Sequence, residues 1–89
     1  MAGTPLQNRE ALRAELFRLL QEIAPELDPA QVAVDRPLRD QVDIDSMDFL
    51  AFIGKIYETL GVDIPESEYG KLRTIQDLVA YLGEKLKLN

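Results

Sequence analysis

Apolar residues recur at helical spacing in three segments of the chain. Within each segment they fall three or four positions apart, which places them on one face of a helix. The three apolar faces are Leu12, Leu16, Leu19, Leu20 and Ile23; Phe49, Phe52, Ile53, Ile56 and Leu60; and Ile75, Leu78, Val79, Leu82 and Leu86. This pattern predicts long helices over approximately residues 5–24, 46–60 and 75–87.

Residues with known preferences at helix ends support these boundaries. Residues 4–7, Thr-Pro-Leu-Gln, have the form of a capping box with proline at the first helical position, where its missing N–H is tolerated. Pro25 is expected to end the first helix, and Gly61 is suited to the C-cap of the second. Thr74 is expected to cap the start of the last helix.

The segments between these helices predict the rest of the architecture. About twenty residues with three prolines form a long loop between the first two helices. Residues 65–69 are expected to form one short helix that Gly70 breaks. Four apolar residues of the long loop are expected to hold it against the bundle: Leu27, Val32, Val34 and Leu38. With no alternation long enough for a sheet, the fold class is all-α, a small bundle of three main helices plus one short helix in a single domain, residues 1–89.

The net charge of the chain limits the classes of molecule that it is expected to bind. Ten lysines and arginines stand against sixteen acids, a net charge of −6, and residues 35–68 alone hold nine acids and three bases. Such a chain repels nucleic-acid phosphates and anionic lipid and attracts basic proteins. No apolar run approaches the roughly 20 residues of a membrane span, and the first ten residues lack the apolar core of an export signal. We expect a cytoplasmic monomer that binds neither nucleic acid nor membranes.

The chain contains neither cysteine nor histidine. The absence of cysteine excludes a disulfide, a thiolate nucleophile and a zinc–cysteine site. The absence of histidine removes the usual general base at neutral pH and the commonest metal ligand. These absences disfavour an enzyme.

Residues 40–48 hold four carboxylates and one serine, for which metal binding and acid–base catalysis are two possible explanations. A calcium loop starting at Asp43 would place Met47 at the fifth position and Gly54 at the twelfth, where oxygen ligands are required. A catalytic carboxylate pair would need a cleft and one acid with a raised pKa, and nothing in the sequence indicates either. Acids that interact favourably with a helix N-terminus are the simpler explanation, and no metal site is predicted.

Ser46 offers a third explanation for this segment. Its simplest role is to cap the helix that follows. No histidine or lysine lies close enough in sequence to activate it as a nucleophile. Its hydroxyl could still be modified by another enzyme, because a phosphodiester at a helix N-terminus meets free backbone N–H groups and the positive end of the dipole.

The segment Asp45-Ser46-Met47-Asp48 resembles the Asp-Ser-Leu motif of acyl carrier proteins. It opens an amphipathic helix after a long loop, as in that family, and residues 61–65 and 74–78 resemble the turns that lead into the family's last two helices. The resemblance implies that Ser46, preceded by Asp45, bears 4′-phosphopantetheine. It also implies a carrier that holds acyl groups as thioesters for enzymes of a fatty-acid, lipid or polyketide-type pathway.

The same resemblance implies which residues meet the partners, a phosphopantetheinyl transferase and acyl-loading or acyl-transferring enzymes with basic docking patches. Three acids match the family's docking positions: Asp45, Asp48 and Glu58. Four further residues fall on a neighbouring face of the same helix: Met47, Leu50, Gly54 and Tyr57. Gly54 costs that helix about 1 kcal/mol relative to alanine, which is compatible with a close approach of a partner. Met47 and Tyr57 depart from the common pattern, which indicates a specialised member with its own enzymes.

Two questions stay open. Phe49, Phe52, Ile56 and Ile64 either pack in the core or line a groove for an acyl chain, and the bulk of the phenylalanines argues against a long chain. The protein as a whole is either a stand-alone carrier, a carrier domain of a polyketide or peptide synthetase, or a small acidic adaptor without a prosthetic group.

Overall fold

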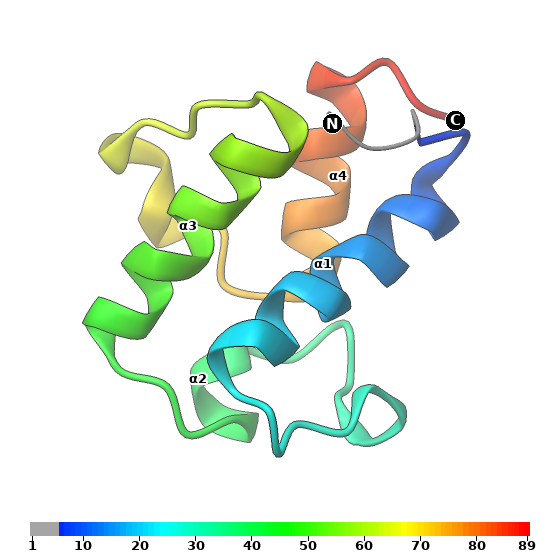
Figure 1. Cartoon of the computed structure of the whole chain (residues 1–89). Coiled ribbons are helices and arrows are strands. Elements are labelled where there is room, and N and C mark those ends of the chain that lie inside the picture. The colour runs from blue at the N-terminus through cyan, green and yellow to red at the C-terminus, as the bar shows by residue number, and fades with distance from the viewer. Residues whose placement is uncertain (1–5) are drawn as a thin grey trace.

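The computed structural model describes residues 6–89, and within this range every regular element is a helix or a 3₁₀ turn. The elements in chain order are α1 (Arg9–Ile23), η1 (Pro29–Gln31), α2 (Leu38–Gln41), α3 (Ser46–Leu60), η2 (Glu66–Lys71) and α4 (Ile75–Lys85). Helix α1 packs against both α3 and α4, while α2 lies within the segment that connects α1 to α3, and η2 within the one that connects α3 to α4 (Figure 1). The all-α prediction with three main helices is confirmed.

The apolar faces predicted from the sequence form the core. Their buried members come from all three long helices: Leu12, Leu16, Leu19 and Leu20 of α1; Phe52, Ile53 and Ile56 of α3; and Ile75, Leu78 and Leu82 of α4. Among the described residues, no polar or charged residue is buried. The bundle is therefore held by apolar burial, and its charges remain at the surface.

Helix α1 begins later than predicted. Asn8 is its N-cap, and the Asn8 side chain accepts a hydrogen bond from the Ala11 N–H at 2.8 Å. Leu6 and Gln7 are not helical, so the predicted start near residue 5 is wrong; Thr4 and Pro5 of the predicted capping box lie outside the described residues. The start of α1 is also tied to the far end of the chain, since the Arg9 N–H donates to the carbonyl of residue 89 at 2.9 Å.

The long loop contains a short helix, α2, that the sequence pattern does not predict. The Leu38 N–H donates to the Arg73 carbonyl at 2.9 Å, which joins α2 to the segment before α4. The Gln41 side chain bonds both the N–H and the carbonyl of Ala33, at 2.7 and 2.9 Å. The predicted packing of the loop is confirmed, because Leu27 and Leu38 are buried and Val32 and Val34 lie against the core.

The remaining boundaries follow the predicted signals with two corrections. Gly61 ends α3 in the left-handed region, φ +74°, and Thr74 caps α4 in a capping box with Asp77. The short helix η2 continues through Gly70 to Lys71, so Gly70 does not break it; Tyr69 and Leu72 pack against the core on either side and override the weak helical preference of glycine. Helix α4 ends at Lys85 instead of residue 87. No helix within residues 6–89 is long and apolar enough to cross a bilayer.

Candidate functional site

Ser46 is the first residue of α3, and its side chain is exposed. The capping role that the sequence suggested for it belongs to Asp45. The Asp45 carboxylate accepts from the Asp48 N–H at 2.9 Å, and the Asp48 carboxylate accepts from the Asp45 N–H at 3.2 Å. This reciprocal capping box begins the helix without any contribution from the Ser46 hydroxyl, which is left free at the surface.

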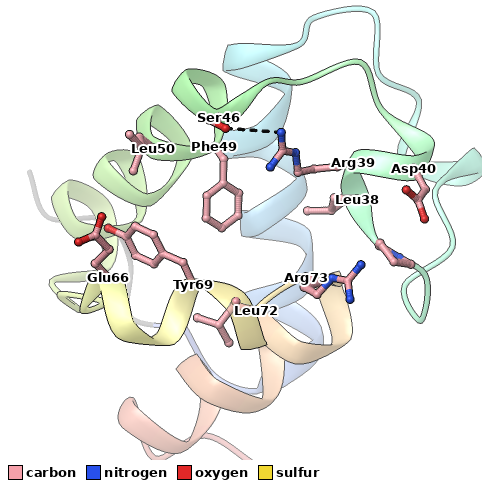
Figure 2. Close-up of a pocket in the computed structure, with 12 residues that line it drawn as sticks. Leu38, Arg39, Asp40, Ser46, Phe49, Leu50, Glu66, Tyr69, Leu72 and Arg73 are labelled. Carbon is pink, nitrogen blue, oxygen red and sulfur yellow. Dashed lines mark hydrogen bonds between the residues drawn. The ribbon is translucent and has the colours of Figure 1, made fainter.

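The surroundings of Ser46 Oγ are sparse. Within the described chain its one hydrogen-bond partner is Arg39 on α2, whose Nη2 lies 3.5 Å away (Figure 2). That distance is long for a hydrogen bond, so the contact is weak. Another molecule can therefore reach the hydroxyl without first breaking a strong interaction.

The site lacks the groups that would activate this hydroxyl. Asp45 and Asp48 hold each other's backbone N–H groups in the capping box. The Arg39 guanidinium carries a permanent charge and cannot accept a proton. The sequence has no histidine, and Arg39, the one hydrogen-bond partner of Ser46 Oγ within the described residues, cannot take its proton.

A groove of about 630 Å³ begins at Ser46 and lies between α2 and η2. We call it the α2–η2 groove. Half-buried Phe49 contributes apolar surface, and the nearly buried Leu38 and Leu72 also line the groove. The Tyr69 ring meets the Phe49 ring edge to face, with centroids 5.7 Å apart. Figure 2 shows these side chains gathered below Ser46, with Arg73 at the opposite end.

The four residues proposed for an acyl-chain groove are not all at this surface. Phe49 is half-buried and lines the α2–η2 groove. Phe52 and Ile56 are fully buried in the core, and Ile64 is 2% exposed. None of these three lines the groove in this structure, so the arrangement matches the core-packing alternative for them, and a role in holding an acyl chain stays a prediction.

The outer face of α3 carries the residues predicted to meet partners. The large apolar residues that are exposed in the described chain all lie on this helix: Met47 at 78%, Leu50 at 51% and Tyr57 at 56%. Gly54 is exposed between them, and Asp45 and Glu58 are exposed acids, whereas Asp48 is half-buried by the capping box. The structure thus presents an apolar strip with acids beside it, while partner contact itself stays a prediction.

Sequence reasoning missed the part of the site that comes from other segments. Arg39, Tyr69 and Arg73 line the groove, yet they lie 7, 23 and 27 positions from Ser46. The hydrogen bond between α2 and the Arg73 carbonyl brings them together, and no local pattern reports it. The described residues contain no cluster of three or more histidines, cysteines or acids that could hold a metal ion.

Charge pairs near α3 serve the fold and not this groove. Lys55 of α3 donates to Glu22 of α1 at 2.9 Å, and Glu22 also binds Arg18. The hydrogen bond from Lys55 and the Lys55 charge, followed by the Arg18 charge and hydrogen bond, hold the pKa of Glu22 below its usual value of 4.5. Lys55, which interrupts the acids and apolar residues of α3, is thus turned toward α1.

Comparisons with known proteins identify the family of the chain. The family model described as "Phosphopantetheine attachment site" matches residues 14–82. An acyl carrier protein of Rhodococcus erythropolis is 32% identical over 74 residues, which cover 83% of this chain and 80% of that protein. An acyl carrier protein of Renibacterium salmoninarum is 35% identical, with 82% and 94% covered, and a meromycolate extension acyl carrier protein of Mycolicibacterium smegmatis is 30% identical, with 83% and 74% covered.

The family match extends over most of the chain, from within α1 to within α4, and includes Ser46. Members of the family are carriers and not enzymes, and their cofactor is 4′-phosphopantetheine. The chain belongs to the acyl carrier protein family.

Proposed function

We propose that Ser46 is the residue to which 4′-phosphopantetheine is attached in this acyl carrier. The observation that carries the proposal is the exposed hydroxyl at the first position of α3, which the Asp45–Asp48 capping box leaves free. Its position in an Asp-Ser sequence within the matched segment supports the same assignment.

The residues around Ser46 fit a phosphodiester-linked group. The first turn of α3 has backbone N–H groups without partners inside the helix, and these favour an anion. The exposed Arg39 guanidinium adds a positive charge near the hydroxyl. When bound, the group supplies the thiol that this cysteine-free chain lacks, and acyl groups are held on it as thioesters.

The proposed partners are a phosphopantetheinyl transferase and acyl-loading or acyl-transferring enzymes with basic docking patches. Asp45 and Glu58 would attract them, and Met47, Leu50 and Tyr57 would supply the apolar contact. Exposed ion pairs contribute only about 0–1 kcal/mol each, so each complex would be short-lived, as a carrier that visits several enzymes requires. We further propose that the carrier is a cytoplasmic monomer that serves a fatty-acid, lipid or polyketide-type pathway.

The test is the intact mass after incubation with a transferase of broad specificity and coenzyme A. The wild type is expected to gain one phosphopantetheine, and Ser46→Ala is expected to gain none. Ser67→Ala is the matched control, because Ser67 is the one other serine of the chain and is exposed. This variant is expected to gain the same mass as the wild type. An unchanged wild-type mass, with a known carrier modified in parallel, would instead favour an adaptor without a prosthetic group.

A further inference from the structure

We propose, given the attachment at Ser46, that Arg39 binds the phosphodiester of the prosthetic arm and that the resting arm lies in the α2–η2 groove. The first observation is the position of Arg39. It stands on α2, a helix of four residues, and its Nη2 lies 3.5 Å from Ser46 Oγ. In Figure 2 the Arg39 side chain is directed toward Ser46, while that of its neighbour Asp40 is directed away.

Contacts of the neighbouring residues hold the backbone that carries Arg39. Leu38, the preceding residue, is buried, and its N–H donates to the Arg73 carbonyl at 2.9 Å. Gln41, at the end of α2, bonds the backbone of Ala33 at 2.7 and 2.9 Å. These contacts fix the backbone that carries Arg39, so its guanidinium stays within reach of Ser46 although the side chain itself is exposed.

The charge of Arg39 is not used by the fold. The ion pairs of residues 6–89 join Glu15, Glu22 and Glu68 to Arg18, Lys55 and Lys71, and Arg39 takes part in none of them. Within the same residues, its one side-chain hydrogen bond is the weak one to Ser46. A guanidinium has five N–H donors, so most of its donors are available to a ligand.

The position of the phosphorus determines which atoms of the prosthetic arm lie next to Arg39. A phosphodiester on Ser46 has its phosphorus bonded to Oγ, which puts its two non-bridging oxygens next to the guanidinium. Arginine binds such oxygens in a planar, two-point geometry that a neutral side chain does not reproduce. Arg39 would exchange its weak bond to a hydroxyl for stronger bonds to an anion.

The α2–η2 groove then offers a surface for the rest of the arm. It starts at Ser46, the attachment residue, and its apolar lining comes from exposed Leu50, half-buried Phe49 and the nearly buried Leu38 and Leu72, with polar groups from Tyr69 and Arg73. Its volume of about 630 Å³ lies inside the range of about 300–1,000 Å³ typical of small-molecule sites. A pantetheine chain combines apolar groups, one dimethyl-bearing carbon and several methylenes, with one hydroxyl and two amides, and this mixed lining complements them. We assign the groove to the arm because the arm is tethered at its edge.

The test compares ¹H–¹⁵N spectra of the apo and modified forms of the full chain. Attachment is expected to shift the Arg39 Nε–H signal and the backbone amides of Gly70 and Leu72, on the far side of the groove. Arg39→Gln has no Nε–H at residue 39, so the comparison uses the Gly70 and Leu72 amides: this variant is expected to lose more than half of their shifts and to move the ³¹P resonance of the modified protein. Arg36→Gln, an equal change at an exposed arginine that does not line the groove, is expected to keep them.

The outcomes separate this inference from the attachment itself. Intact mass is measured on every sample first, so a wild type that gains no phosphopantetheine overturns the attachment at Ser46 and the docked arm with it. Full modification with shifts confined to residues 45–47 overturns the docked arm alone. If Arg39→Gln keeps the wild-type shifts, or if Arg36→Gln loses them equally, Arg39 is not the residue that holds the arm.

Discussion

Replacing Gly54 by alanine tests whether the glycine on the exposed face of α3 serves the fold or the approach of a partner. It lies inside a helix of 15 residues, where glycine is unfavourable, and a Cβ placed on it would meet no atom within 4 Å. Its φ is not positive, since Gly61 is the one glycine of the described chain with positive φ. Nothing within residues 6–89 therefore requires glycine at position 54.

The size of the effect follows from helix propensity alone. Gly54→Ala is expected to raise the free energy of unfolding by about 0.8–1 kcal/mol, the difference between glycine and alanine in a helix interior. For a domain of this size, 1 kcal/mol corresponds to an increase in Tm of roughly 4–8 °C. The added Cβ displaces no neighbouring atom, so no steric cost is subtracted from the predicted gain in the free energy of unfolding.

Gly61→Ala is the matched control. A Cβ at Gly61 also meets nothing within 4 Å, but φ there is +74°. The left-handed region costs a residue with a side chain roughly 1–2 kcal/mol, of which the more restricted unfolded chain offsets about 0.4–1 kcal/mol. The same chemical change is therefore expected to stabilise the protein at residue 54 and to destabilise it at residue 61.

The assay is urea unfolding followed by far-UV circular dichroism, with the m-values compared to confirm that only stability changes. A destabilised Gly54→Ala would refute the reasoning, because it would show that the folded chain itself depends on glycine there. A stabilised variant that is nevertheless modified or acylated more slowly would show instead that a partner approaches the backbone at this position.

Two further predictions concern charge. Lys55→Gln should raise the pKa of Glu22 toward 4.5, measured by NMR titration of its carboxyl group, because the Lys55 hydrogen bond and charge are the main causes of the lowered value. The pKa of Glu22 is depressed in the folded state, so the small stabilisation from the Lys55–Glu22 pair is present at neutral pH and disappears as the pH falls below about 4.5. A Glu22 titration that does not shift in Lys55→Gln would contradict the assignment. Glu58→Lys should slow modification by the transferase at low salt and much less at high salt. The same reversal at Glu26, an exposed acid outside α3, should not slow it, and equal slowing by both variants would argue against docking at α3.

The long helices were predictable because each buries one apolar face. Leu12 to Leu20, Phe52 to Ile56 and Ile75 to Leu82 are spaced as a helix requires, and burial follows that spacing. The start of α1 was misassigned because Thr4 and Asn8 both precede the apolar face as possible caps. Helix α2, with four residues, is too short to show any period.

The site was predictable only where it is local in sequence. The Asp-Ser pair and the apolar strip of α3 can be read from residues 45–57 alone. Even there, the choice of cap between Asp45 and Ser46 depends on Asp48, whose carboxylate completes the capping box with Asp45. Arg39 was missed because its approach to Ser46 depends on the hydrogen bond between Leu38 and Arg73, which are far apart in the sequence.

Tryptic mapping of the modified protein tests the attachment most directly. Cleavage after Arg39 and Lys55 releases peptide 40–55, in which Ser46 is the one hydroxyl-bearing residue, and cleavage after Lys71 places Ser67 in peptide 56–71. We expect the whole added mass of one phosphopantetheine on peptide 40–55. Added mass on peptide 56–71, or on any peptide other than 40–55, would contradict the assignment of Ser46.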